Sequence, residues 1–158
     1  MGEGFSHVDE SGRARMVDVS AKPRSKRRAR AAGRIDLAPA TVALVRANAL
    51  AKGDVLAVAR VAGIMAAKRT AELVPLCHNI EIEQVTVELT VVDDGIEIEA
   101  AALCSDKTGI EMEALTAVSV AALTVYDMCK SLSHEIVIEK THLVSKRGGK
   151  SDIAPIEH

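Results

Sequence analysis

Residues 85–104, VTVELTVVDDGIEIEAAALC, decide the fold because they read as two strands joined by a tight turn. On each side of the turn apolar residues alternate with polar ones, as in strands that bury one face. Asp94-Gly95 is a favoured sequence for a two-residue hairpin turn. The first strand begins further back, at Ile80, and its alternation slips by one residue after Glu83, which predicts a β-bulge.

The segments before this hairpin predict a strand and two helices. Residues 28–37 also alternate between polar and apolar side chains, which indicates a strand with one buried face. Pro39 stands at a first helical position and begins a short helix that stops near Gly53. Asp54 can cap a second, mostly apolar helix that must end before Pro75.

After the hairpin we expect a long helix and a last strand. Thr108 and Glu111 have the spacing of a capping box, in which each side chain bonds the backbone N–H of the other residue. The helix extends to about Leu132, and residues 135–144 form the closing strand. This order predicts an α+β fold: a ferredoxin-like antiparallel sheet with helices packed on one face and an extra helix in the first crossover.

The length predicts one domain, residues 1–158, with an ordered core at about 16–144 and mobile termini at 1–15 and 145–158. Two helices are not expected to cover every apolar strand residue, such as Val87, so the other sheet face needs cover. A short chain has little else to supply, and we therefore expect an oligomer.

The composition disfavours several classes of protein. Apolar residues make up 48% of the chain and charged residues 27%, as in ordinary globular proteins. Phe5 and Tyr126 are the only aromatic residues, which argues against recognition of nucleic acid by base stacking. The net charge is −2, and the three cysteines form no CxxC pair. With no apolar leader or membrane span in the pattern, we expect a cytoplasmic protein without nucleic-acid or membrane partners.

Two polar segments at element junctions are candidates for a functional site. In LCHN, residues 76–79, His78 could relay a proton or bond a ligand, or it could simply bond to backbone. No second ligand pair stands at metal spacing, so we expect no metal. Residues 106–113 open the long helix with several carboxylates. The capping box explains Glu111 but not Glu113.

The third candidate is Asp127 with Lys130, which are neighbours on one helical face in a stretch that is otherwise uncharged. The pair could be an ordinary surface ion pair, but because the stretch is otherwise uncharged we expect Asp127 to be partly buried, where pKa values become tunable. Glu113 and Asp127 would lie about 21 Å apart along the helix, so one chain cannot bring both to one reacting atom. Either one of them is structural or a neighbouring subunit contributes its helix, and we prefer a site formed between subunits.

Several cations suit a polyanionic ligand. Lys52 precedes the second helix, Lys68 interrupts it, and Lys146 and Lys150 flank a glycine pair in the tail. Residues 22–34 hold seven cations and no acid, which we interpret as a solvated strand edge. Because no GxxxxGKS/T or GxGxxG motif is present, side chains would have to hold any phosphate. The motifs alone favour a phosphorylated small molecule.

Four stretches together resemble one known family, molybdenum cofactor biosynthesis protein C, the cyclic pyranopterin monophosphate synthases. They are MVDVSAK at residues 16–22, KGDVLAVARVAGIMAAKRT at 52–70, LVPLCH at 73–78 and KTGIEMEALTAVSVAALTVYDMCK at 107–130. The likeness covers nearly the whole chain. Asn79-Ile80 departs from it, because the family pattern has Pro then Leu at these positions.

The resemblance implies a ferredoxin-like subunit, a homohexamer built as a trimer of dimers, and active sites between subunits. It also implies a lyase that converts (8S)-3′,8-cyclo-7,8-dihydroguanosine 5′-triphosphate to cyclic pyranopterin monophosphate and diphosphate, with no cofactor. The implied catalytic residues are Asp127 and Lys130. The implied substrate-binding residues are Leu76, Cys77, His78, Met112, Glu113, Glu111, Lys52, Lys68 and Lys146.

Two alternatives use the same fold without catalysis. Ferredoxin-like sheets also occur in RNA-binding modules, and the basic residues at 22–34 could contact a phosphate backbone. A module that binds a purine nucleotide without converting it is the second alternative. Diphosphate release from the cyclised nucleotide would separate the enzyme from both.

Overall fold

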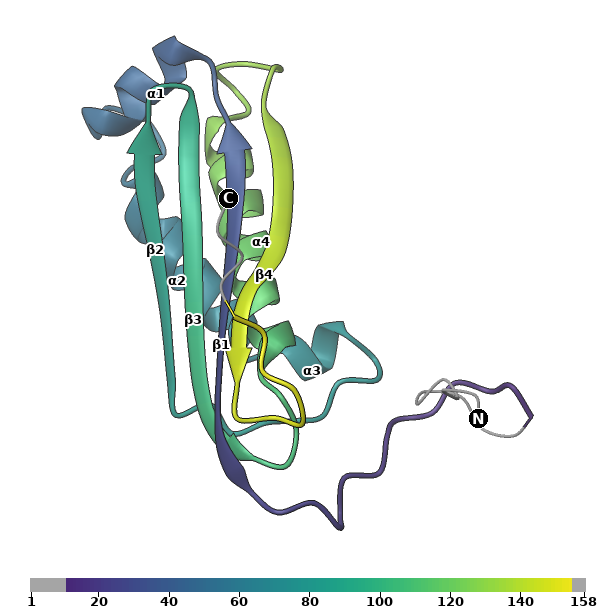
Figure 1. Ribbon diagram of the computed structural model, residues 1–158. Coiled ribbons are helices and arrows are strands. Elements are labelled where there is room, and N and C mark those ends of the chain that lie inside the picture. The colour runs from purple at the N-terminus through teal and green to yellow at the C-terminus, as the bar shows by residue number, and fades with distance from the viewer. Residues whose placement is uncertain (1–10, 155–158) are drawn as a thin grey trace.

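The computed structural model describes residues 11–154, which form a four-stranded antiparallel sheet with helices packed on one face (Figure 1). Along the chain the elements are β1 (Ser25–Asp36), α1 (Pro39–Arg46), α2 (Val55–Ala67), α3 (Thr70–Leu73), β2 (Gln84–Val92), β3 (Gly95–Asp106), α4 (Glu111–Cys129) and β4 (Val137–Arg147). The strands lie in the order β2-β3-β1-β4, and each neighbouring pair is antiparallel. This is the ferredoxin-like topology, so the expected fold class is confirmed.

The β2–β3 hairpin is confirmed, but two of its details differ from the prediction. Val92 pairs with Gly95, so the turn is Asp93-Asp94 and Gly95 already belongs to β3. A Cβ on Gly95 would clash with the carbonyl oxygen of Ile35, so glycine is required for the close approach of β1. The strand also begins later than Ile80: β2 starts at Gln84, which pairs with Leu103. The Glu83 N–H donates to the Leu103 carbonyl oxygen at 2.9 Å, so two residues lie opposite Leu103, as at the expected bulge.

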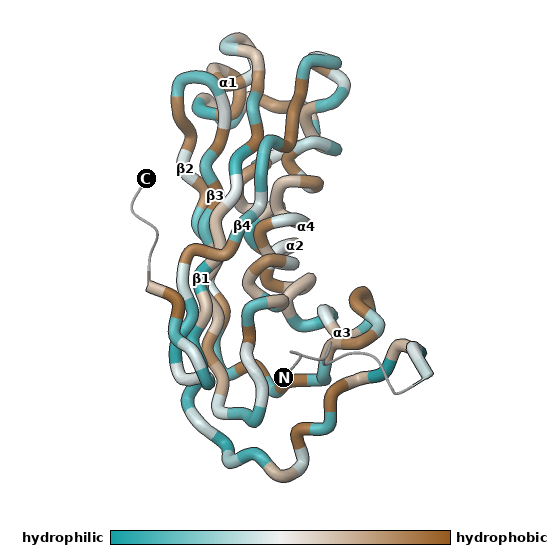
Figure 2. Tube along the Cα trace, turned by 45° about the vertical axis from the view of Figure 1, so that its right-hand side comes forward, coloured by the Kyte–Doolittle hydropathy of each residue, from teal (hydrophilic) through white to brown (hydrophobic). Residues whose placement is uncertain are grey.

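The alternating strand residues all face the helices, contrary to the expectation that some would face away. Val87, Ile96 and Ile98 are at most 1% exposed and belong to the single core under α2 and α4. The opposite face carries charged residues such as Arg30 and Glu99, which pair at 2.8 Å. This alternation can be followed along the strands in Figure 2. The sheet therefore does not supply the apolar surface that oligomerisation would cover.

Most of the exposed large apolar side chains lie instead on the helices, and Val137 of β4 is the exception on the sheet among the described residues. On α2 they are Val58, Val61 and Met65, and near the end of α4 they are Leu123 and Tyr126. Residues of α2 line an open apolar hollow of about 410 Å³. The expectation of an oligomer therefore depends on this helical surface.

The helices follow the capping predictions only in part. Asp54 caps α2 as expected, with its carboxylate 3.0 Å from the Ala57 N–H. The helix expected to reach Pro75 is divided, because α2 ends at Ala67 and α3 is a separate turn. The capping box is wrong: Ile110 is the N-cap residue of α4 and no side chain bonds there.

The segment after residue 144, which was expected to be mobile, is partly structured. α4 ends at Cys129, short of Leu132, whereas β4 continues to Arg147 beyond the expected limit of residue 144. Lys146, near the end of β4, and Ile153 beyond it form two backbone hydrogen bonds, of 3.1 and 2.9 Å. Of the termini expected to be mobile, residues 1–10 and 155–158 lie outside the described residues.

α4 is the central helix of the fold. It packs on α2 and on β1, β3 and β4. By length and composition alone it could cross a membrane, but half of its most apolar window is buried inside this structure. Its apolarity is thus explained by its place between the sheet and α2.

Candidate active site

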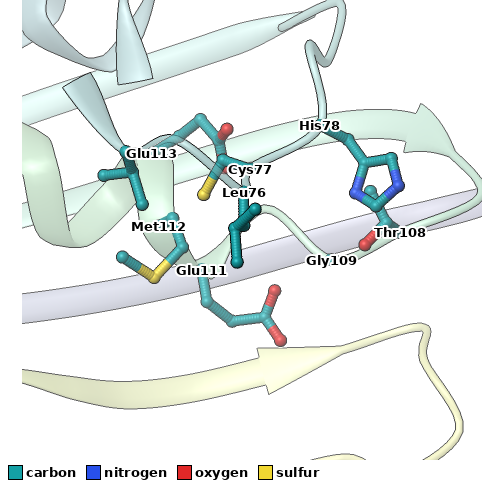
Figure 3. Close-up of a pocket in the computed structure, with 9 residues that line it drawn as sticks. Leu76, Cys77, His78, Thr108, Gly109, Glu111, Met112 and Glu113 are labelled. Carbon is teal, nitrogen blue, oxygen red and sulfur yellow. The ribbon is translucent and has the colours of Figure 1, made fainter. Parts of the chain in front are cut away.

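A pocket of about 450 Å³ opens where the loop after α3 meets the start of α4 (Figure 3). Pro75 ends the helical segment, and the chain then passes through LCH at residues 76–78 toward β2. The pocket is lined by Val74, Leu76, Cys77, His78, Thr108, Gly109, Glu111, Met112 and Glu113. The two junction segments that the sequence analysis singled out therefore face one cavity.

Glu113 is the polar group most strongly affected by this pocket. The residue is 3% exposed, and its Oε2 atom has no hydrogen-bond partner among residues 11–154. Burial, reinforced by the charge of Glu111, raises the pKa of Glu113 to about 7. Burial and the charge of Glu113 also raise the pKa of the Cys77 thiol. The pocket thus holds a carboxyl group that can exchange a proton near neutral pH.

His78 connects this pocket to the segment that precedes β1. Its Nε2 atom lies 2.7 Å from the carbonyl oxygen of Val17. Because a carbonyl oxygen can only accept, Nε2 must donate the proton. Nearby, Lys107 Nζ donates to the carbonyl oxygen of Ser20 at 2.6 Å. Together the two bonds hold the segment before β1 against the rim of the pocket.

A second, basic pocket of about 220 Å³ shares three residues with the first: Thr108, Gly109 and Glu111. Seven cations line it: Lys22, Arg27, Arg28, Lys107, Lys146, Arg147 and Lys150. They come from the start of β1 and the segment before it, the loop before α4, and the end of β4 with the loop that follows. So many cations around one carboxylate favour an anionic ligand.

Glu111 connects the two pockets. Its Oε1 atom lies 2.9 Å from Lys146 Nζ, and both side chains are less than one-third exposed. Figure 3 shows the Glu111 side chain extending toward β4. A Cβ on Gly109 would clash with this carboxylate, so glycine leaves the space that the ion pair needs. Glu111 therefore pairs across the site rather than capping α4.

Asp127 forms a separate cluster with two lysines at the other end of α4. Lys130 Nζ lies 2.6 Å from Asp127 Oδ1, and Lys52 Nζ donates to the Asp127 carbonyl oxygen at 2.8 Å. The bond and charge of Lys130 lower the pKa of Asp127, and Asp127 in turn raises the pKa of Lys130. The Asp127 side chain is 60% exposed, so the expected partial burial is wrong. Its apolar neighbours, such as Leu123, lie on the uncovered surface of α4.

The structure thus divides the expected site residues into two groups. Leu76, Cys77, His78, Glu111, Met112, Glu113 and Lys146 surround the two pockets. Lys52, Asp127 and Lys130 lie at the opposite end of α4. Lys68 is the C-cap residue of α2 and lines neither of the two pockets.

Three cations of the basic pocket were not expected to belong to the site. Lys22, Arg27 and Arg28 belong to the cation-rich run that was interpreted as a solvated edge. The edge interpretation is wrong, because β1 lies between β3 and β4. These three cations line the basic pocket together with Lys107 and Arg147, which come from segments far away in the sequence.

No three His, Cys, Asp or Glu side chains within residues 11–154 lie close enough to hold a metal ion. The groups that could do chemistry are instead a buried carboxyl with a pKa near 7, an imidazole, and a set of cations beside them. These are the parts of a site that moves protons on a small anionic substrate.

Comparison with known proteins shows which family this chain belongs to. The profile of the MoaC family matches residues 16–149, so the chain belongs to that family. It is 55% identical over 149 residues to the cyclic pyranopterin monophosphate synthase of Chloroflexus aggregans, covering 93% of this chain and 90% of that protein. It is 54% identical over 147 residues to the enzyme of that name from Streptomyces coelicolor, covering 93% of this chain and 86% of that protein.

A longer relative is the molybdenum cofactor biosynthesis protein 1 of Drosophila melanogaster, at 56% identity over 150 residues. The match covers 94% of this chain but only 26% of that protein. The resemblance noted in the sequence is therefore confirmed, and the family is one of enzymes of molybdenum cofactor biosynthesis.

Proposed function

We propose that this chain is a cyclic pyranopterin monophosphate synthase, a lyase that converts (8S)-3′,8-cyclo-7,8-dihydroguanosine 5′-triphosphate to cyclic pyranopterin monophosphate and diphosphate. The observation that carries the proposal is the continuity of the two pockets through Thr108, Gly109 and Glu111. One pocket offers proton-exchanging groups and the other offers cations. The substrate joins a polar ring system to a triphosphate and so matches both.

The ring system occupies the pocket of Glu113 and His78 in this proposal. Opening the purine-derived ring requires protons to move on and off nitrogen and oxygen atoms. Glu113 suits such a transfer, because a pKa of about 7 leaves both protonation states populated at neutral pH. Its unpaired Oε2 atom supports a ligand contact, because a buried carboxyl oxygen rarely lacks a partner.

The triphosphate occupies the basic pocket. A hydroxyl group displaces diphosphate from the α-phosphorus, and cations must neutralise the charge that develops on the leaving group. Lys146 is placed for this role, although its pairing with Glu111 must loosen when phosphate binds. Lys52 and Lys68 are proposed to contribute further positive charge.

Asp127 and Lys130 act as the catalytic pair in the proposal, and they must come from a neighbouring subunit. Both lie at the far end of α4 from the pockets. The exposed apolar residues on α2 and α4 support subunit contacts that would bring this end to a second chain. We propose a homohexamer, a trimer of dimers, in which each site uses residues of two chains.

We propose a cytoplasmic location for the enzyme. The proposed reaction requires no metal ion or organic cofactor, and nucleic acid is not a proposed partner. Cys77, Cys104 and Cys129 are all free thiols, which suits a reducing compartment. The scarcity of aromatic residues leaves little for nucleic-acid bases to stack on.

The test is turnover of the cyclised nucleotide by the purified protein, followed by release of diphosphate. Substitution Asp127→Ala should abolish product formation while the oligomer stays intact by size-exclusion chromatography. Asp93→Ala is a matched control, because Asp93 is an exposed acid in the β2–β3 turn that also pairs with a cation. Unchanged turnover in the Asp127 variant would refute its role, and binding without turnover by the unaltered protein would favour the non-catalytic alternative.

A further inference from the structure

The loop that follows β4 is held at both ends by the backbone. Lys146 and Ile153 form two backbone hydrogen bonds that close residues 147–152 into a loop. In Figure 1 this loop lies beside the start of β1 before the chain turns back across the sheet. Four of its residues line the basic pocket: Arg147, Gly149, Lys150 and Ser151. Its shape therefore determines where two of the seven cations lie.

Gly148, inside this loop, is held by close contacts and hydrogen bonds on both sides. Its φ angle is +90°, which favours glycine, and a Cβ there would clash with the carbonyl oxygen of Lys26. Ser25 Oγ donates to the Gly148 carbonyl oxygen at 2.9 Å. The Gly148 N–H donates to Asp152 Oδ1, also at 2.9 Å. Gly148 is thus bonded to β1 through its carbonyl oxygen and to Asp152 through its N–H.

Neither Ser25 nor Asp152 lines the basic pocket. We infer that both are positioning residues: by fixing Gly148 they hold Arg147 and Lys150 at the mouth of the basic pocket in the geometry that an anionic ligand needs. This inference rests on the proposed function for the identity of the ligand, but the geometry concerns any polyphosphate. It assigns a role to an acidic residue beside a cationic site, where its charge alone would oppose anion binding.

The hydrogen bond and the charge of Asp152 should have opposite effects on anion binding, so two substitutions can separate them. Asp152→Asn keeps a side-chain oxygen that can accept from Gly148 and removes the negative charge. Asp152→Ala removes both. If the bond matters, only the alanine variant should weaken anion binding. If only the charge matters, both variants should bind the anion more tightly than the unaltered protein.

The experiment measures binding of inorganic tripolyphosphate by calorimetry at fixed ionic strength, using the full chain. We expect Asp152→Ala and Ser25→Ala each to weaken binding roughly three- to tenfold, the range for one lost hydrogen bond. Ser25→Thr, which retains the bonding group, should bind as tightly as the unaltered protein, and Asp152→Asn, which keeps the bond and loses the opposing charge, should bind at least as tightly. Lys150→Ala, which removes a cation that lines the pocket, is the positive control.

Steady-state kinetics provide a second measurement on the same variants. A positioning role for the phosphate end should raise KM for the cyclised nucleotide in the two alanine variants and leave kcat nearly unchanged. Hydrogen exchange should show that the Gly148 amide is less protected in Asp152→Ala than in Asp152→Asn. A merely structural role would not produce this pattern of rescue.

The inference is overturned if the alanine variants bind tripolyphosphate as tightly as the unaltered protein, if asparagine and alanine at residue 152 behave alike, or if the unaltered protein does not bind tripolyphosphate. Tripolyphosphate binding needs no turnover. If the expected binding pattern is found but no pyranopterin forms, the proposed function fails and the positioning role stands. If turnover is normal but the variants change neither binding nor KM, the positioning role alone fails.

Discussion

Glu113 and Asp127 lie fourteen residues apart on α4, about 21 Å along its axis, and their carboxyl groups have opposite environments. Glu113 is buried without a partner for Oε2, and its pKa is raised to about 7. Asp127 is exposed between two lysines, and its pKa is lowered. One helix thus presents a proton-holding carboxyl at one end and an ionised one at the other.

This separation predicts complementation between inactive chains. Glu113→Ala and Asp127→Ala should each be inactive alone. When they are co-expressed and purified as mixed oligomers, about one quarter of the unaltered activity should return, because a quarter of two-chain sites would combine both intact residues. Diphosphate release provides the measurement.

The control for complementation is a mixture of two chains altered at the same end, Asp127→Ala with Lys130→Ala. Both substitutions affect the contribution of one chain to the site, so no activity should return. Activity no higher in the first mixture than in the second would contradict a site shared between chains.

The buried Glu113 predicts a fall in stability as the pH rises. Its folded-state pKa of about 7 exceeds its ordinary value of 4.5, so the folded protein holds a proton that the unfolded chain releases. The stabilisation is full below pH 4.5 and is lost as the pH rises through 7, by roughly 3 kcal/mol in total. Urea unfolding at pH 5 and pH 8 measures this difference.

Glu113→Gln should remove this component of the pH dependence, since glutamine carries no charge at either pH. Glu72→Gln, at an exposed position on α3, is the matched control and should keep it. An equal loss of stability between pH 5 and pH 8 in the Glu113→Gln variant would show that another group is responsible.

Substitutions at Asp127 and Lys130 should lower activity without lowering the stability of the fold. Their ion pair is solvent-exposed, and exposed pairs contribute little to folding. Lys130→Ala should therefore lower turnover by about 100-fold or more, in line with loss of an acid–base group, while the urea midpoint hardly moves. A large fall in the midpoint would indicate a structural role for the pair instead.

Gly109→Ala should act through Glu111. The new methyl group would clash with the Glu111 carboxylate and displace it from Lys146. We expect the single variant to lose activity to the same extent as Glu111→Ala. In a double-mutant cycle, adding Gly109→Ala to Glu111→Ala should have no further effect. Additive losses of activity would mean that the alanine at residue 109 acts through the local backbone and not through Glu111.

Local features of the sequence were sufficient to predict the elements. Strand alternation and the Asp54 cap depend on residues a few positions apart, and both were found as expected. The capping box failed for the opposite reason. Thr108 and Glu111 have the required spacing, but Lys146 of β4 supplies Glu111 with a partner that lies far away in the sequence.

The site was predicted in part. His78 could be recognised because it follows Cys77 at an element junction, and Glu113 because the capping box did not explain it; the structure brings both to one pocket. The basic pocket was not predicted as a unit, since its cations come from three separate segments. The burial expected for Asp127 was wrong because an apolar helix can leave one side uncovered within its own chain.

Short-range patterns and motifs were enough to predict the order of the strands, the alternation of buried and exposed residues along them, and the family. They could not predict that Glu111 pairs with Lys146, that Glu113 Oε2 is left unpaired among the described residues, or that cations from the β1 and β4 segments line one pocket at the start of α4. Charge pairing and desolvation depend on distances through space, and the antiparallel pairing of distant strands sets those distances.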